Sequence, residues 1–163
     1  MKRHVVRVVA HRPEWSELFK QERRALVERL GHLALEVEHV GSTAVPALDA
    51  KPIIDIAVAV RPTEVVPRLK RPLGGLGYIY GGDAGADGGH IFVKESAPEI
   101  RTHHLHVVAV DDPQWREYLL FRERLRTDEL LRTRYAELKK ALQQRYGQDR
   151  KGYTSGKRHS SKT

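Results

Sequence analysis

Hydrophobic and polar residues follow one another in patterns that predict both strands and helices. A valine-rich alternating stretch at 4–9 predicts a short strand, and apolar residues at helical spacing from Pro13 to a stop at Gly31 predict a helix. Residues 33–40 alternate in the strand manner, and residues 53–60 form an apolar, β-branched run typical of a central strand with both faces covered. The first half of the chain therefore predicts strand, helix, strand and strand.

The second half predicts shorter strands followed by two long helices. In chain order we expect a short helix at 63–69, a strand end at 78–80, a mobile glycine- and aspartate-rich loop at 81–89, neighbouring antiparallel strands at 91–94 and 103–110, helices at about 113–125 and 128–146, and a loosely ordered tail from about 148. No internal repeat or linker composition divides the chain. We expect residues 1–163 to form one α+β domain in which helices pack on one mixed β-sheet.

Composition narrows the functional classes. The 29 basic and 21 acidic residues give a formal net charge of +8, which makes nucleotides or nucleic acid plausible partners, although such an excess also serves as a solvated surface. No cysteine is present, which excludes disulfides and thiolate metal sites, so any metal must be held by oxygen or imidazole. The chain shows no signal-peptide run and is too polar for a membrane span. We expect a cytoplasmic protein without membrane association, and the sequence does not indicate its oligomeric state.

The sharpest local feature is a Gly-Ser turn followed by an acidic residue in an apolar strand. Gly41 lets the backbone approach a ligand closely, and the hydroxyls of Ser42 and Thr43 are suited to bonding phosphate oxygens. Asp55 interrupts the run at 53–60, where a carboxylate is costly unless it is paired or metal-bound. Two interpretations stay open, a phosphate and Mg²⁺ site centred on Asp55, or an ordinary turn with Asp55 paired to Lys51.

Several ordered segments resemble the GrpB family, a branch of the nucleotidyltransferase superfamily. The similarity is carried by residues 37–48 and 51–56, and by further segments in the same order at 11–15, 101–108, 121–126 and 149–157. The resemblance implies a DNA polymerase β-like nucleotidyltransferase fold, in which a Gly-Ser turn binds triphosphate and strand carboxylates bind two Mg²⁺ ions. It places Gly41, Ser42 and Asp55 on those motif positions, with Asp55 as the catalytic residue.

The sequence departs from the superfamily at Ala57, where a second acidic residue is usual, so one metal ligand is missing. His104 and His106 lie two apart and share a strand face, a spacing that suits two imidazole ligands, and Glu38 is a further candidate ligand. The alternatives are a histidine-rich polar face and a solvated glutamate. Imidazole ligands would favour Mn²⁺ or another transition metal over Mg²⁺.

Four basic residues are candidates for anion contacts through their place in the resemblance: Lys51, Arg101, Arg122 and Lys157. The first functional hypothesis is metal-dependent transfer of a nucleotidyl group from a nucleoside triphosphate to an unknown acceptor. The alternative is a catalytically degenerate module that binds a nucleotide, a small phosphorylated ligand or RNA. The resemblance also implies an accessory role in coenzyme A metabolism, since GrpB domains occur attached to dephospho-coenzyme A kinase.

Overall fold

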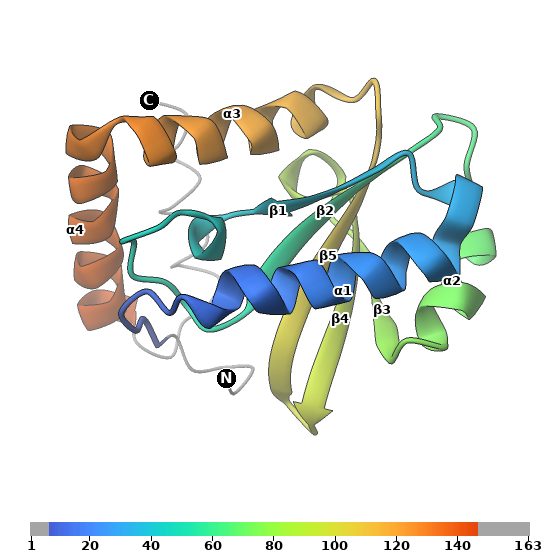
Figure 1. Ribbon diagram of the computed structural model, residues 1–163, viewed down its shortest axis with the longest axis horizontal. Helices are drawn as coiled ribbons and strands as arrows, with labels where there is room; N and C mark the ends of the chain where they lie inside the picture. The colour runs from blue at the N-terminus through green and yellow to red at the C-terminus, as the bar shows by residue number, and fades with distance from the viewer. Residues whose placement is uncertain (1–6, 147–163) are drawn as a thin grey trace.

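A five-stranded mixed sheet with helices on both faces forms the centre of the molecule (Figure 1). The computed structural model describes residues 7–146. The elements are α1 (Glu14–Leu30), β1 (Glu36–Val40), β2 (Ile54–Val60), α2 (Val66–Gly74), β3 (Tyr78–Asp83), β4 (His90–Ala97), β5 (Ile100–Ala109), α3 (Pro113–Thr127) and α4 (Glu129–Tyr146). The strand order is β1-β2-β5-β4-β3, with β2 and β5 parallel and the other neighbours antiparallel. The predicted α+β fold with helices on one mixed sheet is confirmed.

Helices α1 and α2 cover one face of the sheet. Trp15, Leu26 and Leu30 of α1 are buried there, against alternate residues of β2 such as Ile56 and Val58. Gly31 ends α1 as predicted, with φ +55° and its N–H donated to the Val27 carbonyl. This face contains the larger of the apolar clusters in the described part of the chain.

Helix α3 lies against the opposite face, and α4 runs across the C-terminal end of α3 (Figure 1). Asp112 caps α3 by accepting a hydrogen bond from the Gln114 N–H at 2.9 Å. Trp115 of α3 packs with Ala57 and Ala59, the residues of β2 that point away from α1. Both faces of β2 are therefore covered over most of its length, which explains its continuous apolar sequence.

Four expected boundaries need correction. Within the predicted strand at 4–9, residues 1–6 lie outside the described part, and Val9 forms only an isolated bridge with Ala50. The loop predicted at 81–89 is too long, because β3 continues to Asp83 and a 3-10 turn follows at Gly85–Asp87. Glycine disfavours a strand by propensity, but backbone pairing of Gly82 with Ile91 outweighs it.

The short helix predicted at 63–69 begins later, at Val66, and continues through Pro72. Strand β5 begins at Ile100 rather than His103, because the β4–β5 hairpin pairs back to Ala97. The tail expected from about 148 lies outside the described residues. None of the helices between residues 7 and 146 has both the length and the apolar character that crossing a membrane requires.

A buried polar network connects α1 to strands β3, β4 and β5. Glu22 of α1 accepts hydrogen bonds from the Tyr78 hydroxyl at 2.8 Å and from the Lys94 ammonium at 2.6 Å, and its second oxygen lies 3.8 Å from His103 Nε2. Burial, reinforced by the Glu22 charge, raises the pKa of Tyr78. Burial also lowers the pKa of His103, although the Glu22 charge opposes that shift. Glu22 therefore contacts polar groups of β3, β4 and β5 that are buried or partly buried.

Replacing Glu22 by alanine should lower the free energy of unfolding by about 2–4 kcal/mol, because the Tyr78 hydroxyl and the Lys94 ammonium would lose their acceptor inside the protein. Urea denaturation measures the change. Glu28→Ala, at an exposed position of the same helix, is the matched control and should change stability by no more than about 0.5 kcal/mol. Equal losses in the two variants would contradict the assigned role of Glu22.

Candidate functional site

Asp55 is the second residue of β2, on the face covered by α3, where it lies beside the turn that leaves β1. Its backbone is in register with Val40 of β1 and His104 of β5. Gly41 has φ +71° and ψ −170°, a region almost restricted to glycine. A β-carbon on Gly41 would lie 2.8 Å from Asp55 Oδ2, inside the closest contact that such an atom makes. Glycine is therefore required here for two reasons, its backbone conformation and the space that Asp55 occupies.

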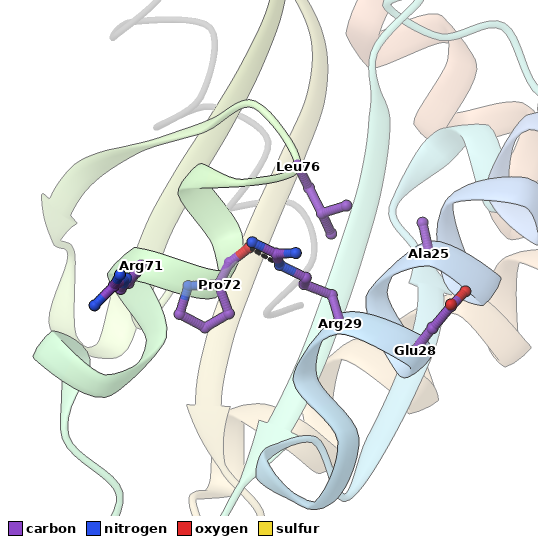
Figure 2. A pocket seen from close by; sticks show the side chains of 6 residues that line it. All are labelled: Ala25, Glu28, Arg29, Arg71, Pro72 and Leu76. Carbon is purple, nitrogen blue, oxygen red and sulfur yellow. Dashed lines mark hydrogen bonds between the residues drawn. The ribbon is translucent and has the colours of Figure 1, made fainter.

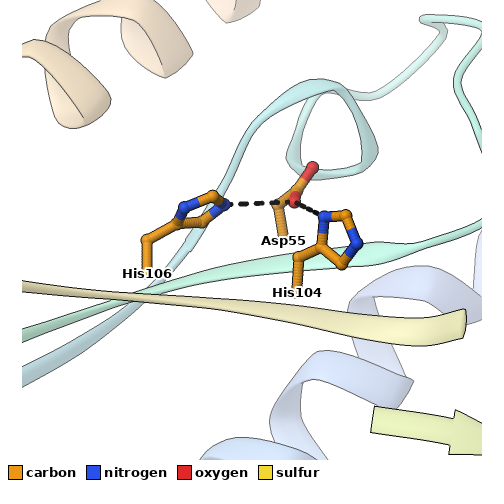
Figure 3. Close-up of side chains that lie close together, drawn as sticks. All are labelled: Asp55, His104 and His106. Carbon is orange, nitrogen blue, oxygen red and sulfur yellow. Dashed lines mark ion pairs between the residues drawn. The ribbon is translucent and has the colours of Figure 1, made fainter. Parts of the chain in front are cut away.

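Two histidines of β5 face the Asp55 carboxylate (Figure 3). His106 Nε2 lies 3.5 Å and His104 Nδ1 3.8 Å from the same oxygen, Oδ1. The Asp55 side chain keeps 26% of its surface exposed, against 13% for His104 and 16% for His106. The structure thus brings together three of the four predicted ligands, because parallel pairing of β2 and β5 aligns their side chains.

The Asp55 carboxyl stays ionised despite its partial burial. Burial alone would raise its pKa, but the hydrogen bond from His106 and the charges of His104, His106 and Lys51 outweigh it and hold the pKa below the ordinary value. Lys51, predicted as an anion contact or as the partner of Asp55, therefore contributes positive charge to this carboxylate. The site is an anionic centre surrounded by nitrogen donors.

The partners of the two histidines orient their rings differently. His106 Nδ1 lies 3.3 Å from the Gly88 carbonyl, which can only accept, so Nδ1 carries hydrogen and Nε2 faces Asp55. His104 Nε2 lies 3.1 Å from Arg101 Nη1, which can only donate, so Nε2 accepts and Nδ1 carries the hydrogen toward Asp55. A carbonyl behind one imidazole nitrogen is the usual support of a metal-binding histidine, and His106 has it.

The hydroxyls of the Gly-Ser turn have different surroundings. Ser42 is only 6% exposed, and its Oγ has no hydrogen-bond partner among residues 7–146. The Thr43 hydroxyl lies 2.9 Å from His39 Nε2 and is already bonded in this structure. An unpaired hydroxyl next to Gly41 is the free polar group that a phosphate oxygen would satisfy.

His39 supports this turn from the α1 side of the sheet. Its ring stacks on Phe19 with centroids 4.8 Å apart. Burial lowers the pKa of His39 to about 4, against the raising effect of Asp55 and with further lowering by Arg126, Arg122 and His11. His39 is therefore neutral near pH 7.

Arginines of α3 hold β1 and the turn from the opposite side. Arg122 Nη1 donates to Glu38 Oε2 at 2.7 Å and to the His39 carbonyl at 3.0 Å, and Arg126 Nε donates to the Ala44 carbonyl at 2.9 Å. Glu38, predicted as a metal ligand, thus pairs with Arg122 and lies outside the Asp55, His104 and His106 cluster. Arg122, predicted as an anion contact, makes these contacts within the protein, while Lys157 lies outside the described residues.

Sequence reasoning missed three supporting residues, Gly88, Arg126 and His39. The carbonyl of Gly88 and the guanidinium of Arg126 act through backbone contacts, which leave no mark in a residue pattern. His39 lies two residues before Gly41, and its place on the same strand face as Val37 was the only available signal.

A groove lies elsewhere on the molecule, away from Asp55. A groove of about 680 Å³ between α1 and α2 is lined by Ala25, Glu28, Arg29, Arg71, Pro72 and Leu76 (Figure 2). Arg29 Nε donates to the Pro72 carbonyl across it at 3.1 Å. None of the predicted site residues is among the residues that line this groove.

The Asp55 cluster fits a divalent transition metal. One carboxylate oxygen and one nitrogen from each histidine lie within 4.8 Å of one another. A tetrahedral ion with bonds of about 2.1 Å separates its ligand atoms by about 3.4 Å, close to the 3.5 and 3.8 Å found here. Two imidazoles and one carboxylate suit Mn²⁺, Fe²⁺ or Zn²⁺ better than Mg²⁺, which prefers oxygen.

Comparison with known proteins gives consistent matches over the whole chain. The family described as GrpB protein matches residues 5–162. A UPF0157 protein of Pseudomonas aeruginosa is 44% identical over 154 residues, covering 93% of this chain and 63% of that protein, so the chain spans less than two thirds of this relative. The crystal structure of a conserved protein GrpB from Enterococcus faecalis is 36% identical, with a TM-score of 0.80 and coverage of 96% of this chain and 98% of that one. A dephospho-CoA kinase of Mycobacterium tuberculosis is 42% identical over 79 residues, covering 44% of this chain and 18% of that protein.

Replacing Gly41 by alanine should cost more stability than the same change at Gly31. Both glycines have positive φ, so each substitution should lose roughly 1–3 kcal/mol from the backbone alone. The Gly31 β-carbon would meet no atom within 4 Å, whereas that of Gly41 would collide with Asp55. Urea denaturation of the two variants isolates the collision, and an equal loss would contradict the close contact of Gly41 with Asp55.

Acid should destabilise the protein partly through His39. The unfolded chain binds this proton with a pKa near 6.5 and the folded chain only at about 4, so the unfolding free energy falls as pH drops from 6.5 to 4. The His39 contribution at pH 5 is about 2 kcal/mol. His39→Gln should reduce the stability difference between pH 7 and pH 5 by that amount in urea titrations, with His32→Gln at an exposed histidine as the control. An unchanged difference in His39→Gln would contradict a neutral buried His39.

Proposed function

The chain belongs to the GrpB family, and from that premise we propose that Asp55, His104 and His106 bind a divalent metal which engages the phosphates of a nucleotide seated on the Gly41-Ser42 turn. The proposed reaction is transfer of a nucleotidyl group from a nucleoside triphosphate to an acceptor. Under this proposal the chain has the fold of a nucleotidyltransferase and acts as one.

One observation carries the proposal. A carboxylate that remains ionised lies within 4 Å of two imidazole nitrogens, beside a glycine turn whose buried Ser42 hydroxyl has no partner among the described residues. Buried polar groups are normally satisfied, so an unsatisfied hydroxyl near three side chains that could hold a metal supports the proposal that a phosphate binds at this turn.

Each side chain has a definite role in this proposal. A bound divalent cation would supply positive charge to the phosphate oxygens. Asp55 and His106 would hold it, Gly41 would let the backbone approach a phosphate, and Ser42 would donate its hydroxyl. Lys51 already lies close enough to affect Asp55 electrostatically and would add positive charge near the ligand.

A second candidate function is nucleotide or RNA binding without transfer. It is favoured by Ala57, the position where a second carboxylate would be expected from the superfamily resemblance. Ala57 is fully buried and packs with Val108 and Trp115, so no oxygen ligand replaces the missing one at that point. A single metal site can bind and orient a phosphate, whereas the two-metal displacement requires a second ion. The net charge of +8 would support binding of RNA.

The partial match to a dephospho-CoA kinase adds a specific ligand to test. That protein is named for a reaction on a coenzyme A precursor, and the match covers 44% of this chain. Dephospho-coenzyme A contains an adenine nucleotide and a pyrophosphate, the groups that the proposed site would recognise. An accessory role in coenzyme A metabolism therefore remains a related proposal.

Calorimetric titration should detect metal-dependent nucleotide binding that requires Asp55. Metal-free protein is titrated with ATP, GTP or dephospho-coenzyme A, in the presence of Mn²⁺ or Mg²⁺. Binding should be tighter with Mn²⁺, because imidazole prefers it, and Asp55→Asn should weaken binding by roughly 100-fold or more.

Asp111→Asn is the matched control, since it removes one negative charge at an exposed position after β5. Incubation with labelled triphosphate then separates the two candidates, because turnover supports transfer, and tight binding without turnover supports a binding module. No nucleotide binding by the unmodified protein with either metal would overturn both.

A further inference from the structure

We propose that Arg101 couples phosphate binding to metal binding by controlling whether His104 is available as a ligand. The proposal rests on the proposed function, in that it assumes a metal at Asp55 and His106. It adds a mechanism by which binding of phosphate and binding of metal depend on each other. It follows from the different partners of the two histidines.

In the structure as it stands, His104 offers no lone pair toward Asp55. Arg101 Nη1 lies 3.1 Å from His104 Nε2, and a guanidinium has hydrogens to donate but no acceptor. Nε2 is therefore the accepting nitrogen, which leaves the hydrogen on Nδ1, 3.8 Å from Asp55 Oδ1. A cation shared with Asp55 would meet an N–H bond at this position instead of a ligand atom.

His106 is in the opposite arrangement. The Gly88 carbonyl holds the hydrogen on Nδ1, and Nε2 faces Asp55 at 3.5 Å. A cation that displaces the hydrogen bond between His106 and Asp55 would be held by these two side chains, and His104 is a third ligand that Arg101 withholds.

A phosphate near the Gly-Ser turn would compete with His104 for Arg101. Guanidinium binds a phosphate through charge-assisted, often bidentate, hydrogen bonds that are about twice as strong as those to a neutral acceptor. Once Arg101 turns to the phosphate, His104 Nε2 takes a proton from solvent and Nδ1 gives one up. The ring remains neutral, and the Nδ1 lone pair then faces the cation.

The coupling works in both directions. If phosphate raises metal affinity by completing the ligand set, thermodynamic linkage requires that metal raise phosphate affinity by the same factor. Removal of a residue that orients a ligand typically changes metal affinity by 10- to 100-fold. We expect a change of roughly tenfold, since His104 is one ligand of three.

The test is a titration of metal-free full-length protein with Mn²⁺, with and without methyl phosphate, a monoester that binds Mn²⁺ weakly by itself. Methyl phosphate should tighten Mn²⁺ binding by roughly tenfold. Arg101→Met should bind Mn²⁺ as tightly without phosphate as the unmodified protein does with it, and phosphate should tighten it no further. Arg116→Met, at an exposed arginine of α3, is the control for removing one positive charge.

A double-mutant cycle separates release of His104 from simple loss of charge. In a His104→Gln background, Arg101→Met should have no effect on Mn²⁺ affinity, because the ligand that it releases is gone. Nitrogen-15 spectra of the histidine rings give a second readout, since His104 should carry its hydrogen on Nδ1 in the free protein and on Nε2 with Zn²⁺ and methyl phosphate bound.

The outcomes distinguish failure of the coupling from failure of the proposed function. Mn²⁺ binding that is unaffected by methyl phosphate, or an Arg101→Met effect of equal size in the His104→Gln background, would overturn the coupling and leave the metal site in place. Coupled binding of Mn²⁺ and methyl phosphate without any nucleotide binding would support the coupling and overturn the nucleotide proposal. Absence of Mn²⁺ binding to the unmodified protein would overturn both.

Discussion

An ionised carboxylate in a strand that is otherwise covered on both faces is the constraint on which the site depends. Asp55 lies between the apolar residues Ile54 and Ile56, where a charge is costly unless polar groups surround it. Parallel pairing of β2 with β5 supplies two imidazoles, and the glycine turn after β1 leaves the space for its second oxygen. Each of these neighbours is explained by the need to keep one negative charge satisfied.

The two faces of the sheet divide structural and chemical work. On the α1 face, Glu22 holds polar groups of three strands in a closed network next to the largest apolar cluster. On the α3 face, the small side chains of Ala57 and Ala59 let Trp115 pack closely, while Arg122 and Arg126 hold the turn in place. Because helix α3 is joined to the turn by charged hydrogen bonds, the position of the Gly-Ser segment depends on both halves of the chain.

The side chains of the site could be predicted from the sequence, but the residues that hold them in place could not. Asp55 stood out as a charge in an apolar run. The spacing of His104 and His106 placed both on one face of their strand, whichever strand paired with it. That β5 would lie parallel to β2, and so bring these residues to Asp55, is a property of the whole topology and of no local pattern. Glu38 was a candidate metal ligand with a solvated glutamate as the alternative, but Arg122, 84 positions away along the chain, pairs with it. Long-range side-chain pairing is the information that single-residue patterns lack.

Under the proposed function, histidine ligands in place of a second carboxylate would change the charge of the metal-bound site. A divalent cation held by one aspartate and two neutral imidazoles would leave a net charge of +1, whereas a second carboxylate at Ala57 would bring it to zero. Lys51 and Arg101 add further positive charge around the same point. Such a centre would attract the phosphates of a substrate and also those of a product, because both carry negative charge. Catalysis requires tighter binding of the transition state than of the ground state, so the same substitutions that favour phosphate capture also favour slow release. If the proposed metal site is correct, the charge of its ligand set would favour a binding module over a transferase as much as the missing second carboxylate would.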